Sequence, residues 1–129
     1  MSSRSETKFL SYYRFDEALE DLGSPANLRI ADHILRFQRA WRQSRTDSEL
    51  NGSFKFKHYD DVDGPYRLCQ IYVGPNSDFR AAVMFPQGKA ATYWVYVFKK
   101  QRGNDRAQVK RAKLFAKDCW NTIKGDKNG

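Results

Sequence analysis

The run from Thr92 to Phe98 constrains the fold of this chain more than any other stretch. Seven apolar, aromatic or β-branched residues, TYWVYVF, follow one another without a charged or strongly polar side chain. A strand with one solvated face would place a polar residue at every second position, so this run indicates a strand buried on both faces. It ends abruptly in Lys99, Lys100 and Arg102. A central strand that carries cations to its own end suggests a rigid platform for an anionic ligand, whereas the alternative is that the lysines only solvate the strand end.

The charge balance narrows the classes of partner. The formal net charge is +8 and the isoelectric point is near 9.6. Such a surplus favours nucleic acid, an anionic membrane face or an acidic protein. No apolar run approaches the roughly 18 residues of a membrane span. Because Met1 to Glu6 contain no apolar segment, we expect no secretory signal and no membrane association.

The two cysteines, Cys69 and Cys119, stand far apart and form no CxxC pair. We therefore expect two buried free thiols in a reducing, cytoplasmic setting rather than a disulfide. The length suits a single domain, which we place at residues 8–120, with flexible tails at 1–7 and 121–129.

The N-terminal part is expected to contribute a strand and two helices. Residues 8–15 carry four aromatic side chains and indicate a first strand, after which Asp16 can cap a short helix that Gly23 closes. Ser24 and Pro25 then indicate the start of a longer helix that runs to about Ser44. The polar residues 43–52 are expected to form a loop.

The remainder reads as a meander of strands followed by one helix. The strand patterns cover 54–59, 66–73, 79–85 and the run after residue 91, and short Gly- and Pro-containing turns separate them. Consecutive strands joined by short turns predict antiparallel pairing. Asn104 or Asp105 can cap a last, basic helix. The predicted class is therefore α+β.

The aspartates at 60, 61 and 63 raise the question of a calcium site. Their spacing does not fit the EF-hand pattern, because Gly is missing at its sixth position and no bidentate Glu follows. We expect a turn here and no metal site.

Two short tracts give the chain a family resemblance. Pro65-Tyr66-Arg67-Leu68, and Tyr96-Val97-Phe98-Lys99-Lys100 followed by a basic helix with alanines, resemble the RelE/HigB superfamily of toxins, in particular its HigB-like, phage-derived branch. The resemblance covers roughly Phe9 to Trp120. It implies a RelE-like domain: a mostly antiparallel sheet of four or five strands, two N-terminal helices and a basic C-terminal helix. It also implies a type II toxin–antitoxin module with an acidic antitoxin, and ribosome-dependent cleavage of mRNA without a metal or a small-molecule cofactor.

The implied chemistry defines the candidate site. The RNA 2′-hydroxyl attacks the adjacent phosphorus and leaves a cyclic phosphate, so the site needs proton carriers and cations that stabilise the transition state. Arg67 matches the arginine of the family's tyrosine–arginine tract. The candidate catalytic residues are Lys55, Lys57, His58, Arg67 and Arg80. The candidate RNA-binding residues are Tyr66, Lys99, Lys100, Arg102, Lys110 and Arg111.

Several alternatives stay open at this point. Antiparallel topology places Arg67 and Arg80 at opposite ends of the meander, and strict alternation puts His58 on the face of Phe54 and Phe56, where a structural role is equally expected. The chain also lacks a histidine near its C-terminus, where HigB-like members often carry one. The competing functions are a gyrase-directed toxin of the ParE-like branch and a non-enzymatic RNA-binding module.

Overall fold

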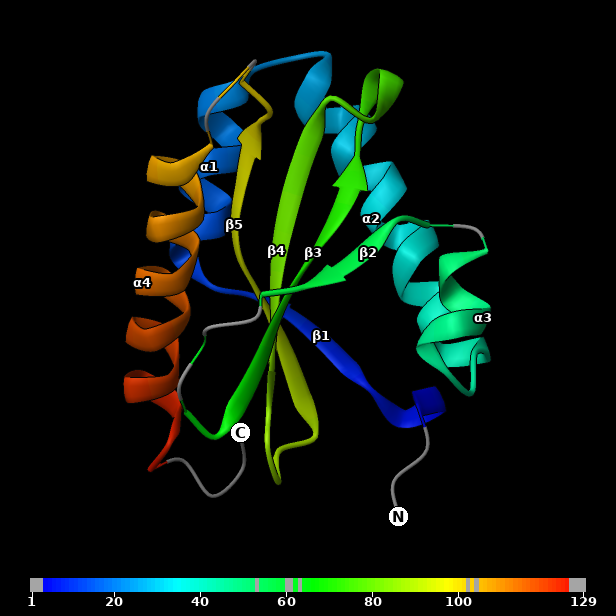
Figure 1. The fold of residues 1–129 in the computed structure, drawn as a ribbon, viewed down its shortest axis with the longest axis vertical. Coiled ribbons are helices and arrows are strands. Elements are labelled where there is room, and N and C mark those ends of the chain that lie inside the picture. Colours follow the sequence, from blue (N-terminus) through cyan, green and yellow to red (C-terminus); the bar gives the residue numbers. More distant parts are fainter. Residues whose placement is uncertain are drawn as a thin grey trace.

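Five strands form one sheet in the order β1-β5-β4-β3-β2 (Figure 1). The computed structural model describes residues 4–52, 54–59, 62, 64–101, 103 and 105–125. The strands are β1 (Lys8–Ser11), β2 (Phe56–His58), β3 (Tyr66–Val73), β4 (Phe79–Pro86) and β5 (Ala91–Lys99). β1 pairs with β5 in parallel and the other neighbours are antiparallel. The expected α+β class and mostly antiparallel sheet are confirmed.

The apolar run lies in β5, which has a neighbouring strand on each side and helices on both faces. Trp94 and Val97 belong to one buried cluster, and Val95, Tyr96 and Phe98 belong to the other. Simple alternation would separate Val95 from Tyr96. A register shift beside Ala82 and Val83 pairs Tyr96 with Ala82 and Trp94 with Val83, so Val95 is an extra residue in its strand. This β-bulge lets two consecutive side chains face the same layer.

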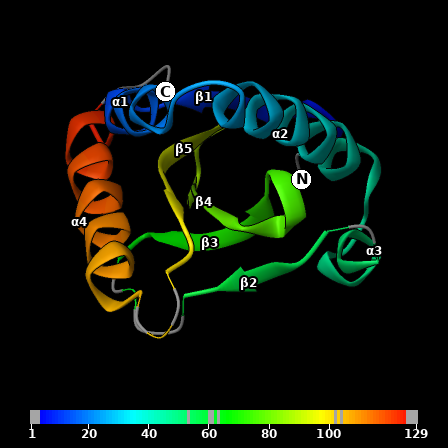
Figure 2. The same cartoon turned by 90° about the horizontal axis from the view of Figure 1, so that it is seen from above.

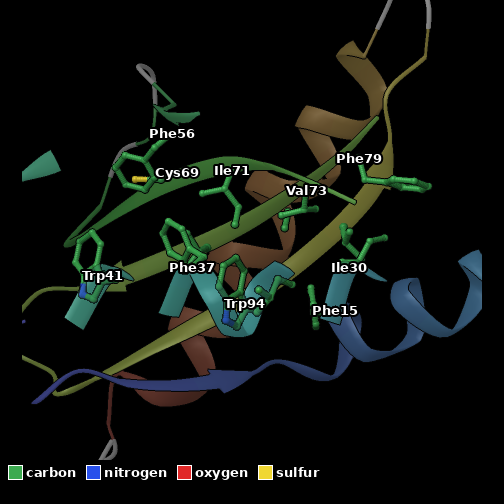
Figure 3. Close-up of a cluster of buried hydrophobic side chains, with 14 of the residues drawn as sticks. Phe15, Ile30, Phe37, Trp41, Phe56, Cys69, Ile71, Val73, Phe79 and Trp94 are labelled. Atoms are coloured by element: carbon green, nitrogen blue, oxygen red, sulfur yellow. The ribbon is translucent and has the colours of Figure 1, made fainter. Parts of the chain in front are cut away.

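Helix α2 (Ala26–Gln43) covers one face of the sheet. Its buried residues Ile30, Ile34, Phe37 and Trp41 recur at helical spacing and meet the inward side chains of β3, β4 and β5 (Figure 3). Phe37 is fully buried at the centre of this cluster. Seen from above, the sheet curls around the layer that α2 fills (Figure 2).

Helix α4 (Arg106–Ile123) covers the opposite face. Ala112, Ala116 and Cys119 are fully buried against that face, and their small side chains allow a close approach of the helix to the strands. Cys69 and Cys119 are both buried free thiols, as expected. None of the described helices is long and apolar enough to cross a lipid bilayer.

The first strand is shorter than predicted. It ends at Ser11, and helix α1 (Tyr13–Leu22) begins where the aromatic stretch was expected to continue the strand. Asp16 therefore lies in the first turn of α1 and is not its cap. Phe15, Ala18, Leu19 and Leu22 explain the difference, because their spacing gives a helix an apolar side that packs into the α2 cluster.

A short helix, α3 (Asp47–Asn51), occupies the segment that was expected to be a loop. The Thr46 hydroxyl accepts a hydrogen bond from the Glu49 N–H at 3.3 Å, and the Glu49 carboxylate accepts one from the Arg45 N–H at 2.8 Å. Leu50 is buried beneath it. A cap and a single buried side chain thus fold a segment that composition describes as polar.

Ordered structure extends past both of the expected domain ends. Residues Arg4–Glu6 form a short 3-10 helix, η1, and the guanidinium of Arg4 lies 3.8 Å from the centre of the Trp41 ring. At the other end α4 continues to Ile123, which is buried. The long helix α2 begins at Ala26, one residue after the predicted start. The aspartates at 60, 61 and 63 lie outside the described residues.

Candidate functional site

The five candidate catalytic residues divide between the two faces of the sheet. Along β2, Lys57 lies opposite Gln70 and His58 lies opposite Cys69. Because successive side chains of a strand point to opposite faces, Lys57 lies on the α4 face, and His58 lies on the α2 face. Arg67 pairs with Phe85 on the α2 side, while Arg80 pairs with Tyr72 on the α4 side. The predicted single centre that includes Arg67 is therefore not formed.

Arg80, Tyr72 and Lys55 form the core of one cationic cluster. The Arg80 guanidinium carbon lies 3.5 Å from the centre of the Tyr72 ring, and the Lys55 ammonium lies 5.4 Å from the same ring centre. The Tyr72 N–H also donates to the Lys55 carbonyl at 3.2 Å, which holds Lys55 beside β3. Lys57 follows two residues later on the same face. We call Lys55, Lys57, Tyr72 and Arg80 the Arg80 surface.

The backbone fixes the orientation of Arg80. Its Nη1 donates to the Ser77 carbonyl at 2.7 Å and to the Phe79 carbonyl at 3.1 Å. Ser77 belongs to the short 3-10 helix η2 (Pro75–Ser77), and its φ of 57° turns the chain so that this carbonyl faces the guanidinium. Arg80 is 8% exposed. A guanidinium held by a ring and two carbonyls keeps its net positive charge, because neither kind of partner neutralises it.

An ion pair between Lys100 and Asp105 lies beside this cluster. The Lys100 ammonium lies 2.5 Å from the Asp105 carboxylate, which also accepts the Gln101 N–H at 3.0 Å. Burial raises the pKa of Asp105, but the hydrogen bonds from Lys100 and Gln101 and the charges of Lys100 and Arg80 outweigh it, so the pKa is lowered. Asp105 is thus ionised at neutral pH and partly offsets the cations around it.

A pair of hydrogen-bonded side chains, Tyr59 and Gln70, lies next to the Arg80 surface. The Tyr59 hydroxyl donates to the Gln70 side-chain oxygen at 2.8 Å. Burial is the main cause that raises the pKa of Tyr59 well above its usual value, and the carboxylate of Asp105 acts in the same direction. Tyr59 therefore keeps its proton at neutral pH and can act as a donor but not as a base.

Arg67 and His58 belong to a separate network around Asp47. The Asp47 carboxylate lies 2.5 Å from Arg4 Nη2, 3.1 Å from His58 Nε2 and 3.9 Å from Arg67 Nη1. Burial raises the pKa of Asp47. The hydrogen bonds from Arg4 and His58 and the charges of Arg4 and Arg67 have a larger, opposite effect, so the pKa lies below its usual value. This network ties η1, α3, β2 and β3 together, so its clearest role is structural.

His58 has a partner at each ring nitrogen. Its Nδ1 lies 3.2 Å from the Cys69 sulfur, opposite the contact of Nε2 with Asp47. Burial raises the pKa of the Cys69 thiol to about 12, so the sulfur carries its proton at neutral pH. An ionised carboxylate only accepts, so Nε2 donates to Asp47, and in the neutral ring Nδ1 accepts from the thiol. The structure thus favours the structural alternative for His58.

The candidate RNA-binding residues are also dispersed. Tyr66 is buried and packs against Trp120, with ring centres 6.1 Å apart. Lys99 and Arg111 line a cleft between α1, β5 and α4, and Lys110 is exposed on α4. Arg102 lies outside the described residues.

Sequence reasoning missed two residues of the Arg80 surface region, Gln70 and Tyr72. Along β3, Gln70 and Tyr72 alternate with the buried residues Cys69, Ile71 and Val73. This alternation in the sequence indicates that Gln70 and Tyr72 lie on the more solvated face of the strand. In the described part of the chain, no cluster of three His, Cys, Asp or Glu side chains is arranged to hold a metal ion.

Comparisons of this chain with protein-family models, with curated proteins and with solved structures gave no match, so the functional argument stands on the residues and their geometry.

Proposed function

We propose that this chain is an RNA-directed toxin of the RelE/HigB type that acts as an mRNA endoribonuclease, and that RNA phosphates bind at the Arg80 surface. The observation that carries the proposal is the convergence of three cations on one face of the sheet. Lys55 and Arg80 share the ring of Tyr72, and Lys57 stands beside them on β2. Cations around this partly buried ring suit a single strand, whose phosphates they attract.

The order of elements also supports the proposal. The resemblance implies a strand, two helices, a series of antiparallel strands and a basic helix, and the chain has this order with the short helix α3 added before β2. The short strand β2 lies at the edge of the sheet and carries Lys57, with Lys55 just before it. An edge strand has no neighbour on one side, so an RNA strand can approach it without displacing protein backbone.

The proposed reaction is attack of an RNA 2′-hydroxyl on the adjacent phosphorus, with release of the 5′-oxygen. The products are a 2′,3′-cyclic phosphate and a 5′-hydroxyl end. Arg80 and Lys55 stabilise the negative charge that develops on the phosphoryl oxygens. The ammonium of Lys57 protonates the leaving oxygen, and the 2′ proton passes to solvent. Arg67 and His58 have no part in this version of the site, because the alternation of β3 and β2 puts them on the other face, near Asp47.

A second candidate function, RNA binding without cleavage, is favoured by one observation. His58, the candidate proton carrier, has a hydrogen-bond partner at each ring nitrogen, on the face opposite the Arg80 surface. The Arg80 surface then retains the cations that bind phosphate but has no imidazole beside them.

Mapping of transcript 5′ ends after induced expression in bacteria tests the proposal. The wild-type chain should arrest growth and create new 5′-hydroxyl ends within mRNA. Lys57→Ala should reduce these ends about 100-fold or more, the range for a lost proton donor. Arg39→Ala, which removes an exposed cation from α2, should leave them unchanged.

The other outcomes separate the competing functions. Growth arrest with intact transcripts and DNA damage would identify a gyrase-directed toxin and contradict the ribonuclease. RNA binding by the purified chain without cleavage in the presence of ribosomes would leave the binding module as the function.

A further inference from the structure

A cleft of about 390 Å³ lies between α1, β5 and α4, apart from the Arg80 surface. Its walls come from three elements that are distant in the sequence. Among the lining residues are Arg14, Glu17, Asp21, Lys99, Arg111 and Phe115. A volume of this size is within the range of small-molecule sites.

Aromatic rings form the floor of the cleft. Tyr96 and Phe115 meet edge to face, with ring centres 5.3 Å apart. The Arg14 guanidinium lies 5.3 Å from the centre of Phe115 and 4.7 Å from that of Tyr13. A flat heterocycle can stack on one of these planes, because aromatic rings and guanidinium groups both favour π contacts.

Charged side chains line each wall of the cleft. Lys99 and Arg111 supply cations from β5 and α4, whereas α1 supplies the carboxylates of Glu17 and Asp21. The α1 wall also carries Arg14, whose Nη1 lies 3.4 Å from the Glu17 carboxylate. Glu17 and Asp21 are four residues apart in α1, so they lie on the same side of the helix. The Gln108 side-chain oxygen accepts the Tyr96 hydroxyl at 2.5 Å, which holds that amide at the rim. The charged lining thus comprises three cations and two carboxylates, which suits a ligand that has both an anionic group and hydrogen-bond donors.

We infer that the cleft binds one nucleotide of the RNA, with a guanine base toward Glu17 and Asp21 and its phosphate toward Lys99 and Arg111. A carboxylate only accepts hydrogen bonds, and guanine is the base whose Watson–Crick edge offers two adjacent N–H donor groups. On the same edge uracil offers one N–H between two carbonyl acceptors, and adenine and cytosine each offer only an amino group as donor. The inference rests on the proposed function, because it takes RNA as the ligand.

The position of the cleft links it to the Arg80 surface. Arg80 pairs in register with Phe98, and Phe98 lines the cleft. The two sites therefore lie at the same level of neighbouring strands. An RNA strand that passes the end of β5 near Lys99 and Lys100 reaches both, so the cleft would make the RNA interaction prefer guanine at one position.

Titration of the isotope-labelled chain with GMP, AMP, CMP and UMP, followed by NMR, tests the inference. GMP should bind most tightly and shift resonances of Phe115 and Gln108. Glu17→Gln or Asp21→Asn should weaken GMP about 10-fold and leave UMP unchanged, since a bidentate base contact is lost. Glu20→Gln, an exposed α1 residue outside the cleft lining, is the matched control and should change nothing.

Further variants distinguish this site from the proposed function. Arg111→Ala should weaken all four nucleotides alike, whereas Lys57→Ala should leave GMP binding intact while it reduces RNA cleavage. A short single-stranded RNA with one guanine should bind more tightly than GMP and compete with it. Equal affinity for the four nucleotides, or shifts confined to the Arg80 surface, would contradict the inference that the cleft binds guanine. Neither result would bear on the nuclease proposal. GMP binding without competition by the RNA would overturn its role in RNA recognition.

Discussion

The partners of each arginine decide what it can do in this molecule. Arg80 contacts a ring and two backbone carbonyls, none of which neutralises its charge, so it adds to the local positive potential although its side chain is largely buried. Arg67 lies near the carboxylate of Asp47, and Arg4 is bound to the same group. Two arginines of the same sheet thus have different capacities. Arg80 can attract an anion, whereas Arg67 helps to stabilise the fold.

Acid should destabilise the fold in part through Asp47. Its folded-state pKa is below its usual value, so the unfolded chain binds more protons as pH falls through that range. The stability that this group adds is complete at neutral pH and is lost as the pH falls through the usual carboxyl range and on through the lowered pKa of the folded state. Denaturant unfolding at pH 7 and pH 3 should show a smaller loss for Asp47→Asn than for the wild type.

Asp16→Asn is the matched control for that measurement, because this carboxylate is exposed in the first turn of α1. It should retain the full acid sensitivity of the wild type. Equal loss of stability in Asp47→Asn and the wild type would mean that the Asp47 network contributes nothing to the fold.

Among the secondary-structure elements, the short helix α3 makes contacts with several other parts of the fold. α3 has five residues, yet it positions Asp47 against Arg4, His58 and Arg67. Its start depends on the hydroxyl of Thr46, and its contact with the core depends on Leu50. Loss of either feature would release the network that joins the N-terminal segment to the edge of the sheet.

Thr46→Ala should lower the free energy of unfolding by about 1 kcal/mol, the usual cost of a lost N-cap. Ser48→Ala, an exposed substitution inside the same helix, should change it by less than about 0.5 kcal/mol. Urea denaturation followed by tryptophan fluorescence measures both. Equal stabilities of the two variants would show that the cap does not hold α3.

The strongest local signals predicted the elements best. The β3 pattern and the run in β5 were identified nearly to the residue. The β5 segment is a continuous apolar stretch, the β3 segment is rich in apolar and aromatic residues, and turn residues flank both. The boundary between β1 and α1 was missed, since Tyr12, Tyr13 and Phe15 suit a strand as well as a helix. For α3 the available signal was Thr46 followed by Glu49 three residues later, which is the spacing of a capping box.

The candidate site was predictable only in part, because neighbouring residues of a strand point to opposite faces of the sheet. Lys57 and His58 are adjacent, so a strand places them on opposite faces, and the alternation had already put His58 with Phe54 and Phe56. What the sequence could not supply was which face each helix covers and where Arg67 meets α3. Tyr72 and the α1 wall of the cleft also required the sheet register and the packing of α1.

For the whole molecule, the two faces of the sheet have different tasks. The α2 face is closed by large aromatic side chains around Phe37 (Figure 3). On the α4 face the helix covers Tyr66 and Leu68 in the first half of β3, whereas Gln70 and Tyr72 in the second half are only partly buried. The net charge of +8 gives the whole molecule a positive field, and under the proposed function this uncovered half of the face is where RNA binds.

The salt dependence of binding to a short single-stranded RNA tests the Arg80 surface most directly. The slope of log affinity against log salt concentration reports the number of phosphates that the protein neutralises, at roughly 0.7 per contact for single strands. Replacement of both Lys55 and Lys57 by alanine should flatten the slope by about 1.4, while replacement of Arg36 and Arg39 on the outer side of α2 should leave it unchanged. Equal flattening by the two double variants would mean that the RNA meets the charge of the whole surface and no defined site, which would contradict the account.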